Sequence, residues 1–223
     1  MSKPIKNMYS CPTNIPALPN MGCAIRYGQV QKIAFTRIGN RFASLNPITD
    51  LSSWTERLSA EDSTKIVVTP YVESPTMDGG DEKTFGGGNE TRDGIEIVMG
   101  AEPIRMSFAL RNYPQSIISA LKILAKIRDL GVFLINGDGG IICLQEGGTY
   151  APIPIRAMFI GDLILGGREQ PDRNTMKFSF KQNYSDSLVV VRPDFNPISD
   201  LANIDVHIGD GSFSLAFNQS YDL

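Results

Sequence analysis

The sequence predicts a mainly β domain of the α+β class. We expect an antiparallel β-sandwich or partly closed barrel with one flanking α-helix at about 114–130 and a long extended loop at about 78–94. Short β-branched and aromatic segments follow one another along the chain, tight-turn signals separate them, and one long amphipathic helical pattern stands among them. Such a helix has to cover a sheet in order to bury its apolar side.

The composition is that of a globular protein, with 223 residues of which 42% are hydrophobic and 20% charged. A chain of this size can bury a core without metal or disulfide support. We expect two segments, an N-terminal extended arm at 1–22 and a single β-sandwich domain at 23–223. The arm contains four prolines, and Ile15, Leu18 and Met21 give it apolar side chains that could dock on a partner. A disordered tail is the alternative.

Charge and cysteine content exclude several classes of function. The net charge of -3 and the absence of a Lys/Arg cluster argue against broad binding of a phosphate backbone. Three cysteines without C-x-x-C spacing and a single histidine predict free thiols in a reducing compartment rather than a zinc site. No apolar run approaches the ~18 residues of a membrane span. We therefore expect that the protein is made in the cytoplasm and does not associate with membranes.

The first elements lie before the extended loop. Ala24–Arg37 alternates like a strand, with a possible bulge at Gly28 or Gln29. Thr49–Leu58 has helical spacing, and its Ser53-x-x-Glu56 sequence predicts a capping box around the core anchor Trp54. Lys65–Val72 is rich in β-branched residues, and its proline predicts an edge strand or a strand end.

The elements after the loop are strands around one helix. Ile95–Met99 and Ile104–Leu110 are predicted strands, and Pro114–Leu130 is a predicted helix that begins with proline and ends at Gly131. The NGDGG and GDGS sequences predict two tight hairpins. The remaining predicted strands are Val132–Ile135, Ile141–Gln145, Ile153–Ile160, Thr175–Lys181, Ser187–Arg192, Asn203–Ile208 and Ser212–Phe217.

The extended loop is the strongest functional signal in the sequence. It contains six glycines, and its five carboxylates against two cations give it a local charge of -3. A structureless loop of this length in a compact domain is usually functional or disordered. We expect it to become ordered on a neighbouring subunit. The candidate contact residues are Asp78, Asp81, Glu82, Phe85, Gly87, Glu90, Arg92 and Asp93.

No catalytic, cofactor-binding or metal-binding residue is predicted. The three glycines at 86–88 lack the sequence of a phosphate-binding loop, and the carboxylates lack the spacing of a calcium loop. His207 alternates with apolar residues in a predicted strand, and no nucleophile signature accompanies it. The sequence therefore predicts a protein that is not an enzyme and that uses no cofactor.

The order TKIVVTPYVESP, acidic glycine loop, DGIEIVMGAEP, and then strand, helix and hairpins resembles that of bacteriophage major tail tube proteins over roughly residues 24–220. This resemblance implies hexameric rings that stack into a tube around a channel for DNA. The implied partners are further copies of the chain, other virion tail proteins, and DNA as non-specific passing cargo. The implied location is the phage tail, assembled in the cytoplasm of a bacterial host. An acidic channel wall would repel DNA and let it slide.

Two departures and two alternatives accompany this resemblance. The proline-rich start and Pro70 do not suit strands that line a channel, because proline donates no ladder hydrogen bond. The chain could instead be another phage structural protein, for head–tail completion, the baseplate or decoration. It could also be a carbohydrate-binding β-sandwich, whose candidate aromatic residues Tyr71, Phe85 and Tyr150 have core packing as their simpler role.

Overall fold

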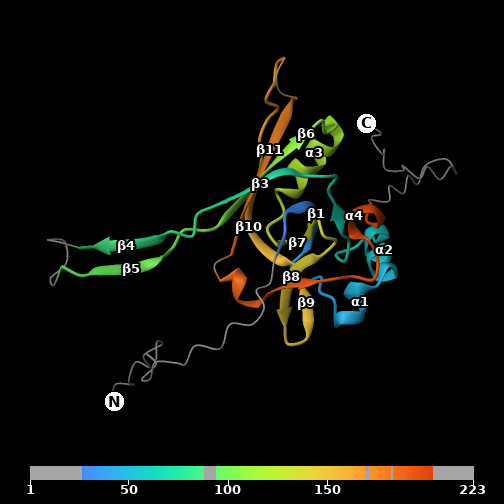
Figure 1. Cartoon of the computed structure of the whole chain (residues 1–223), viewed down its shortest axis with the longest axis horizontal. Helices are drawn as coiled ribbons and strands as arrows, with labels where there is room; N and C mark the ends of the chain where they lie inside the picture. Colours follow the sequence, from blue (N-terminus) through green and yellow to red (C-terminus); the bar gives the residue numbers. More distant parts are fainter. Residues whose placement is uncertain (1–26, 88–93, 169–170, 182, 203–223) are drawn as a thin grey trace.

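The computed structural model describes residues 27–87, 94–168, 171–181 and 183–202. They form an antiparallel sheet of ten strands, a separate two-stranded ribbon and four helices (Figure 1). The large sheet does not close on itself, and its main path runs β12-β8-β7-β10-β11-β6-β3. The predicted mainly β, sandwich-like fold is therefore confirmed, in its open form. Its strands are β1 Val30–Arg37, β2 Val67–Val68, β3 Glu73–Asp78, β6 Arg105–Arg111, β7 Leu130–Asn136, β8 Ile141–Glu146, β9 Thr149–Ala151, β10 Ile153–Ile160, β11 Arg173–Phe180 and β12 Leu188–Val191.

The central strand is β7, whose seven residues are all buried. It pairs with β1 along one edge, and with β8 and β10 along the other. Alternate side chains enter two separate cores. Val132 and Leu134 belong to one core, whereas Phe133 and Ile135 belong to the other. A strand buried on both faces needs an unbroken apolar sequence, which LGVFLIN supplies.

Strand β10 joins the two halves of the sheet. Its first residues, Ile153 and Pro154, pair with β7, and the segment from Ile155 to Ile160 pairs with β11. The second half, β10-β11-β6-β3, lies against one face of the first half and encloses the larger core, which includes Phe35, Phe108 and Phe178. The helices α1 (Leu45–Thr49), α2 (Leu51–Ser59) and α4 (Pro197–Asp200) cover the opposite face of the first half.

Trp54 is the anchor that the sequence predicted. It is fully buried, its indole nitrogen donates a 2.9 Å hydrogen bond to the carbonyl of Ile48, and its ring packs against Phe42 and Phe133. The predicted capping box is wrong, because α2 begins at Leu51 with Asp50 as its N-cap residue. Ser53 consequently lies within the first turn of the helix and not before it.

The helix predicted at 114–130 is shorter than expected. Helix α3 spans Gln115–Leu124. Asp129, just before β7, is already hydrogen-bonded to the segment after β1, because its carbonyl accepts a 2.8 Å hydrogen bond from the amide of Ile38. Gly131 does not end the helix, since it lies in β7. A Cβ atom there would lie 3.0 Å from the Cβ of Pro152, so this glycine allows β7 and β10 to approach closely.

The NGDGG hairpin between β7 and β8 is confirmed. The side-chain oxygen of the buried Asn136 accepts hydrogen bonds from the amides of Asp138 at 3.1 Å and Gly140 at 2.7 Å. Its amide nitrogen donates to the carbonyl of Tyr27 at 2.7 Å. One side chain therefore holds the turn and fixes it to the segment that precedes β1.

Other boundaries differ from the prediction. The strand expected at 24–37 starts at Val30 within the described residues, and the one expected at 65–72 is reduced to Val67–Val68. Pro70 lies outside that strand, as its missing amide requires. Helices α1 and α4 and strand β9 were not predicted. The arm at 1–22 and the hairpin expected at 203–217 lie outside the described residues.

Lys32 joins the beginning of the domain to its end. Its side chain is only 3% exposed, and its ammonium group donates to the carbonyls of Ile198 at 2.6 Å and Leu201 at 3.2 Å, at the C-terminal end of α4. Burial lowers the pKa of Lys32 below its ordinary value of 10.5. The cation suits the last carbonyls of a helix, which carry partial negative charge.

Replacing Lys32 with methionine should lower the free energy of unfolding by about 1–3 kcal/mol, because two carbonyls lose their donor. The pKa of Lys32 is lower in the folded protein than in the unfolded chain. Between these two pKa values the unfolded chain binds more protons, so the free energy of unfolding of the wild type rises with pH. The difference between wild type and Lys32→Met should therefore widen as pH approaches 10.5. Urea unfolding at pH 7 and 9.5, with the exposed Lys65→Met as control, measures this. A stability difference between wild type and Lys32→Met that narrows from pH 7 to pH 9.5 would contradict the lowered pKa of Lys32.

Candidate assembly surface

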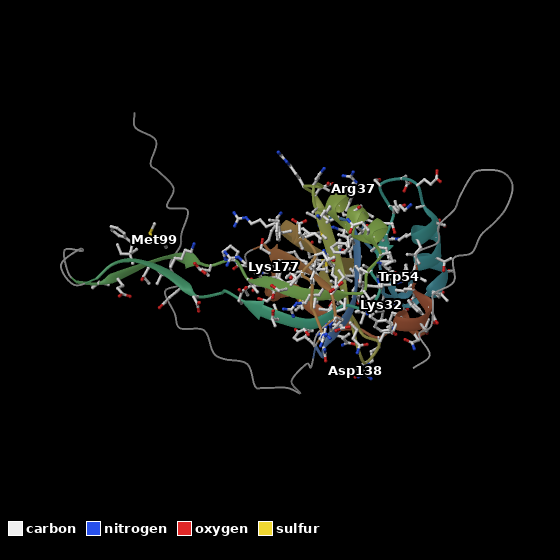
Figure 2. The ribbon with its side chains drawn as sticks, turned by 90° about the horizontal axis from the view of Figure 1, so that it is seen from above. Lys32, Arg37, Trp54, Met99, Asp138 and Lys177 are labelled. Atoms are coloured by element: carbon white, nitrogen blue, oxygen red, sulfur yellow. The ribbon has the colours of Figure 1, made fainter. Side chains whose placement is uncertain are left out.

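The segment expected as a loop is a two-stranded ribbon. Strand β4 (Glu82–Gly86) pairs antiparallel with β5 (Glu96–Ala101), and only residues 88–93 between them lie outside the described part. The expectation of a structureless loop from 78 to 94 was therefore wrong, although the excursion itself exists. The ribbon leaves the body in both views (Figure 1 and Figure 2). In Figure 2, Met99 on the ribbon lies far from the core residue Trp54.

Two glycines form the root of the ribbon. Strands β3 and β6 pair from Glu73 to Asp78, and the chain then turns through Gly79 and Gly80, whose φ angles are +88° and +89°. Pairing resumes where the amide of Gly80 donates to the carbonyl of Glu102 at 3.2 Å. A Cβ atom on Gly79 would lie 2.5 Å from the carbonyl oxygen of Pro103. The root accordingly requires glycine for its positive φ and for its lack of a side chain.

Apolar side chains occupy both faces of the ribbon. Phe85 lies opposite Ile97, and the adjacent pair, Thr84 and Val98, points to the other face because side chains alternate along a strand. The exposed fractions are 58% for Phe85, 62% for Val98 and 71% for Met99. Two-stranded hairpins are marginal in water, and contiguous exposed apolar side chains usually mark a contact site. The ribbon has the features of a surface that another molecule covers.

Acidic groups surround these apolar side chains. Asp81, Glu82 and Glu96 are exposed along the ribbon, and the ammonium of Lys83 lies 3.7 Å from the carboxylate of Glu102 at its root. The contact is exposed, so it adds little to stability. The described part of the ribbon is therefore an apolar strip with acidic margins.

The structure places five of the predicted contact residues on the ribbon or at its root, and the others lie outside the described residues. Those on the ribbon or its root are Asp78, Asp81, Glu82, Phe85 and Gly87. Those outside the description are Glu90, Arg92, Asp93 and, in the N-terminal segment, Ile15, Leu18 and Met21. Sequence reasoning did not include the exposed Ile97, Val98 and Met99 among the candidate contact residues. The signal was the apolar run IVM directly beside a glycine-rich acidic segment.

A second apolar surface lies at the tip of the β10–β11 hairpin, which projects from the body beside α3 (Figure 1). Its exposed side chains are Phe159, Leu163, Ile164 and Leu165. A 2.7 Å ion pair between Lys122 of α3 and Asp162 ties the tip to the helix, and the bridge between Ile164 and Arg173 extends the hairpin. Two projecting hairpins thus expose apolar surface at separate places on the molecule.

The residues that the sequence suggested for metal binding, thiol chemistry and stacking have different surroundings in the described part of the chain. They contain no cluster of His, Cys, Asp and Glu that could hold a metal ion. The buried Cys143 has a pKa raised to about 12 by burial, so its thiol stays protonated and unreactive. Tyr150 is buried, which confirms its packing role, whereas Tyr71 and Phe85 are exposed. No helix in the described ranges is long and apolar enough to cross a membrane.

No known protein family and no curated protein matches this chain. Among solved structures, a chain of the virion of a native gene transfer agent (GTA) particle is similar over 53% of this chain and 83% of its own length. The identity is 12% and the TM-score is 0.30. A likeness at this level carries no argument about function, so the function has to be inferred from the chain's own geometry.

Replacing Gly79 with alanine should loosen the root of the ribbon, because the new Cβ meets a backbone carbonyl at an unfavourable φ. We expect hydrogen exchange of the Gly80 and Glu102 amides to become about tenfold faster or more, while the melting temperature of the body changes little. Gly39→Ala is the matched control, since a Cβ atom on Gly39 would have no neighbour within 4 Å. Equal exchange in all three proteins would show that the root tolerates a side chain.

Proposed function

We propose that this chain is a structural protein of a phage virion that self-assembles into stacked rings and forms the tail tube, a channel for DNA passage. The observation that carries the proposal is the ribbon, which projects from the body with Phe85 and Ile97 on one face and Val98 on the other. Exposed apolar surface of this kind usually marks a contact with another molecule, and a subunit of a repeating assembly makes such a contact in every copy.

The free energy available from covering the ribbon is sufficient for association. Full burial of a large apolar side chain contributes about 1.5–3 kcal/mol, and Phe85, Ile97, Val98 and Met99 are all more than half exposed. Ordering the ribbon and fixing two molecules together oppose this gain. A contact repeated by every subunit of a ring or tube accumulates enough burial to offset those costs.

The sheet also offers free edges for pairing between copies. Strand β3 ends the sheet within the described part of the chain, and β10 pairs only with β11 beyond Ile155. Edges at opposite sides of a sheet join copies head to tail, and this kind of contact closes into rings when its rotation closes. A protein that avoids aggregation normally blunts such edges.

One face of the sheet is basic and does not suit the acidic channel wall that the net charge led us to expect. The outer side of the β6–β11 pair exposes Arg105 and Lys177, and Lys177 lies near the root of the ribbon in Figure 2. A wall that repels DNA has to be built from another surface of the chain. In this proposal DNA remains a passing cargo, the protein is not an enzyme, and assembly takes place in the bacterial cytoplasm with other tail proteins as neighbours.

Another phage structural role is the second candidate, for head–tail completion, the baseplate or decoration. The tip of the β10–β11 hairpin favours it, because Leu163 and Leu165 give the molecule a second apolar contact surface that a different virion protein could cover. A carbohydrate-binding role has less support, since the buried Tyr150 is unavailable for stacking.

Electron microscopy of the purified chain at increasing concentration tests the proposal. We expect tubes or six-fold rings for the wild type, and Phe85→Ser should raise the concentration for half-assembly about tenfold or more because each contact loses a buried ring. Leu45→Ser, at an exposed apolar residue of α1, is the control and should assemble like wild type. A wild-type protein that remains monomeric at every concentration would exclude self-assembly.

Limited proteolysis gives an independent measurement. The segment between Asp78 and Gly94 should be cleaved in the monomer and protected in the assembly, since a contact that covers the ribbon also excludes the protease. Cleavage at equal rates in both states would remove the ribbon from the proposed interface.

A further inference from the structure

A groove lies between the turn that follows α3 and strand β10. Its volume is about 450 Å³, and its walls are Ala125 to Arg128 on one side and Ile155 to Met158 on the other. The floor is apolar, because Ile155 is buried and the half-buried Ile127 and Met158 pack against the larger core. The groove thus belongs to the rigid body of the domain.

Three cations surround this groove. Lys126 and Arg128 come from the turn, Arg156 comes from β10, and all three are exposed. In the described ranges of the chain none of them forms an ion pair. Like charges around one depression repel each other, so an acidic occupant would be favoured electrostatically. The groove therefore fits a ligand with an apolar centre and carboxylates at its margins.

The ribbon has this chemistry. On one face of the ribbon the exposed Val98 lies between Glu96 on its own strand and Glu82 on β4, because side chains alternate along each strand. The match is of charge as well as of apolar surface, since the groove is basic where the ribbon is acidic. Because the ribbon projects away from its own body in both views, it meets a groove of this kind on another molecule (Figure 1 and Figure 2).

We propose that the groove between the α3 turn and β10 receives the β4–β5 ribbon of a second copy of this chain. Val98 lies on the apolar floor, and Glu82 and Glu96 on the same face of the ribbon meet Lys126, Arg128 and Arg156. This inference depends on the self-assembly proposed above and names the surface that accepts the ribbon. The contact is heterologous, because each copy gives a ribbon and receives one at a different place.

Charge exchange between two variants tests the pairing. The acceptor variant carries Lys126→Glu and Arg128→Glu, and the donor variant carries Glu82→Lys and Glu96→Lys. Each alone should require at least about a tenfold higher concentration for half-assembly, because like charges then face each other. A mixture of the two should assemble as well as wild type, since every ribbon again finds a groove of opposite charge. The control Lys65→Glu with Arg192→Glu makes the same charge change at exposed sites elsewhere.

The outcomes separate this inference from the proposed function. Wild-type assembly that neither variant disturbs, or a mixture that fails to recover, would overturn the ribbon–groove pairing while self-assembly stands. Absence of wild-type assembly would overturn both. A carbodiimide cross-link between Lys126 and Glu82 or Glu96, found between light and heavy isotope-labelled copies, would support the pairing directly. A groove occupied instead by residues 203–223 of the same chain would give cross-links within one copy only, which would contradict it.

Discussion

The structure depends on one strand that is buried on both of its faces. Strand β7 is paired along both edges, and its side chains alternate between a core closed by the second half of the sheet and a core closed by the helices around Trp54. Every other element of the body lies against this strand directly or through its neighbours. Its backbone groups are satisfied by β1, β8 and β10, so a substitution that exposes either face would disturb both cores.

The ribbon is the opposite case. Its two strands are paired with each other alone, neither face is covered, and its apolar side chains are more exposed than those of the body. The body buries most of its apolar side chains in its two cores, whereas the large apolar side chains of the ribbon remain exposed. A rigid domain thus carries an exposed hairpin whose position is set by two glycines at its root.

Much of the body could be predicted because local sequence and burial agree there. Strand β10 has the predicted bounds, and the turn at Asn136 follows from its glycines and its asparagine. The end of α3 could not be predicted, because the apolar spacing continues through Ile127 while pairing between β1 and β7 takes Asp129 into the sheet. Phe85 and the acidic residues of the ribbon were found from composition. Val98 and Met99 were assigned to an ordinary strand, since an apolar run gives no sign that its strand lacks a covering layer.

The contacts of Lys32 place a condition on synthesis. Its partner carbonyl in Leu201 is 169 residues further along the chain, and β1 has to wait for β7 before it can pair. During synthesis the apolar β4–β5 segment therefore leaves the ribosome long before β7 and Leu201 are available to complete the fold of the domain. On polysomes, where nascent chains crowd together, this order exposes unfinished copies to premature association. If the ribbon pairs with the basic groove as proposed, the acidic margins would also keep emerging ribbons apart by mutual repulsion until that groove has formed.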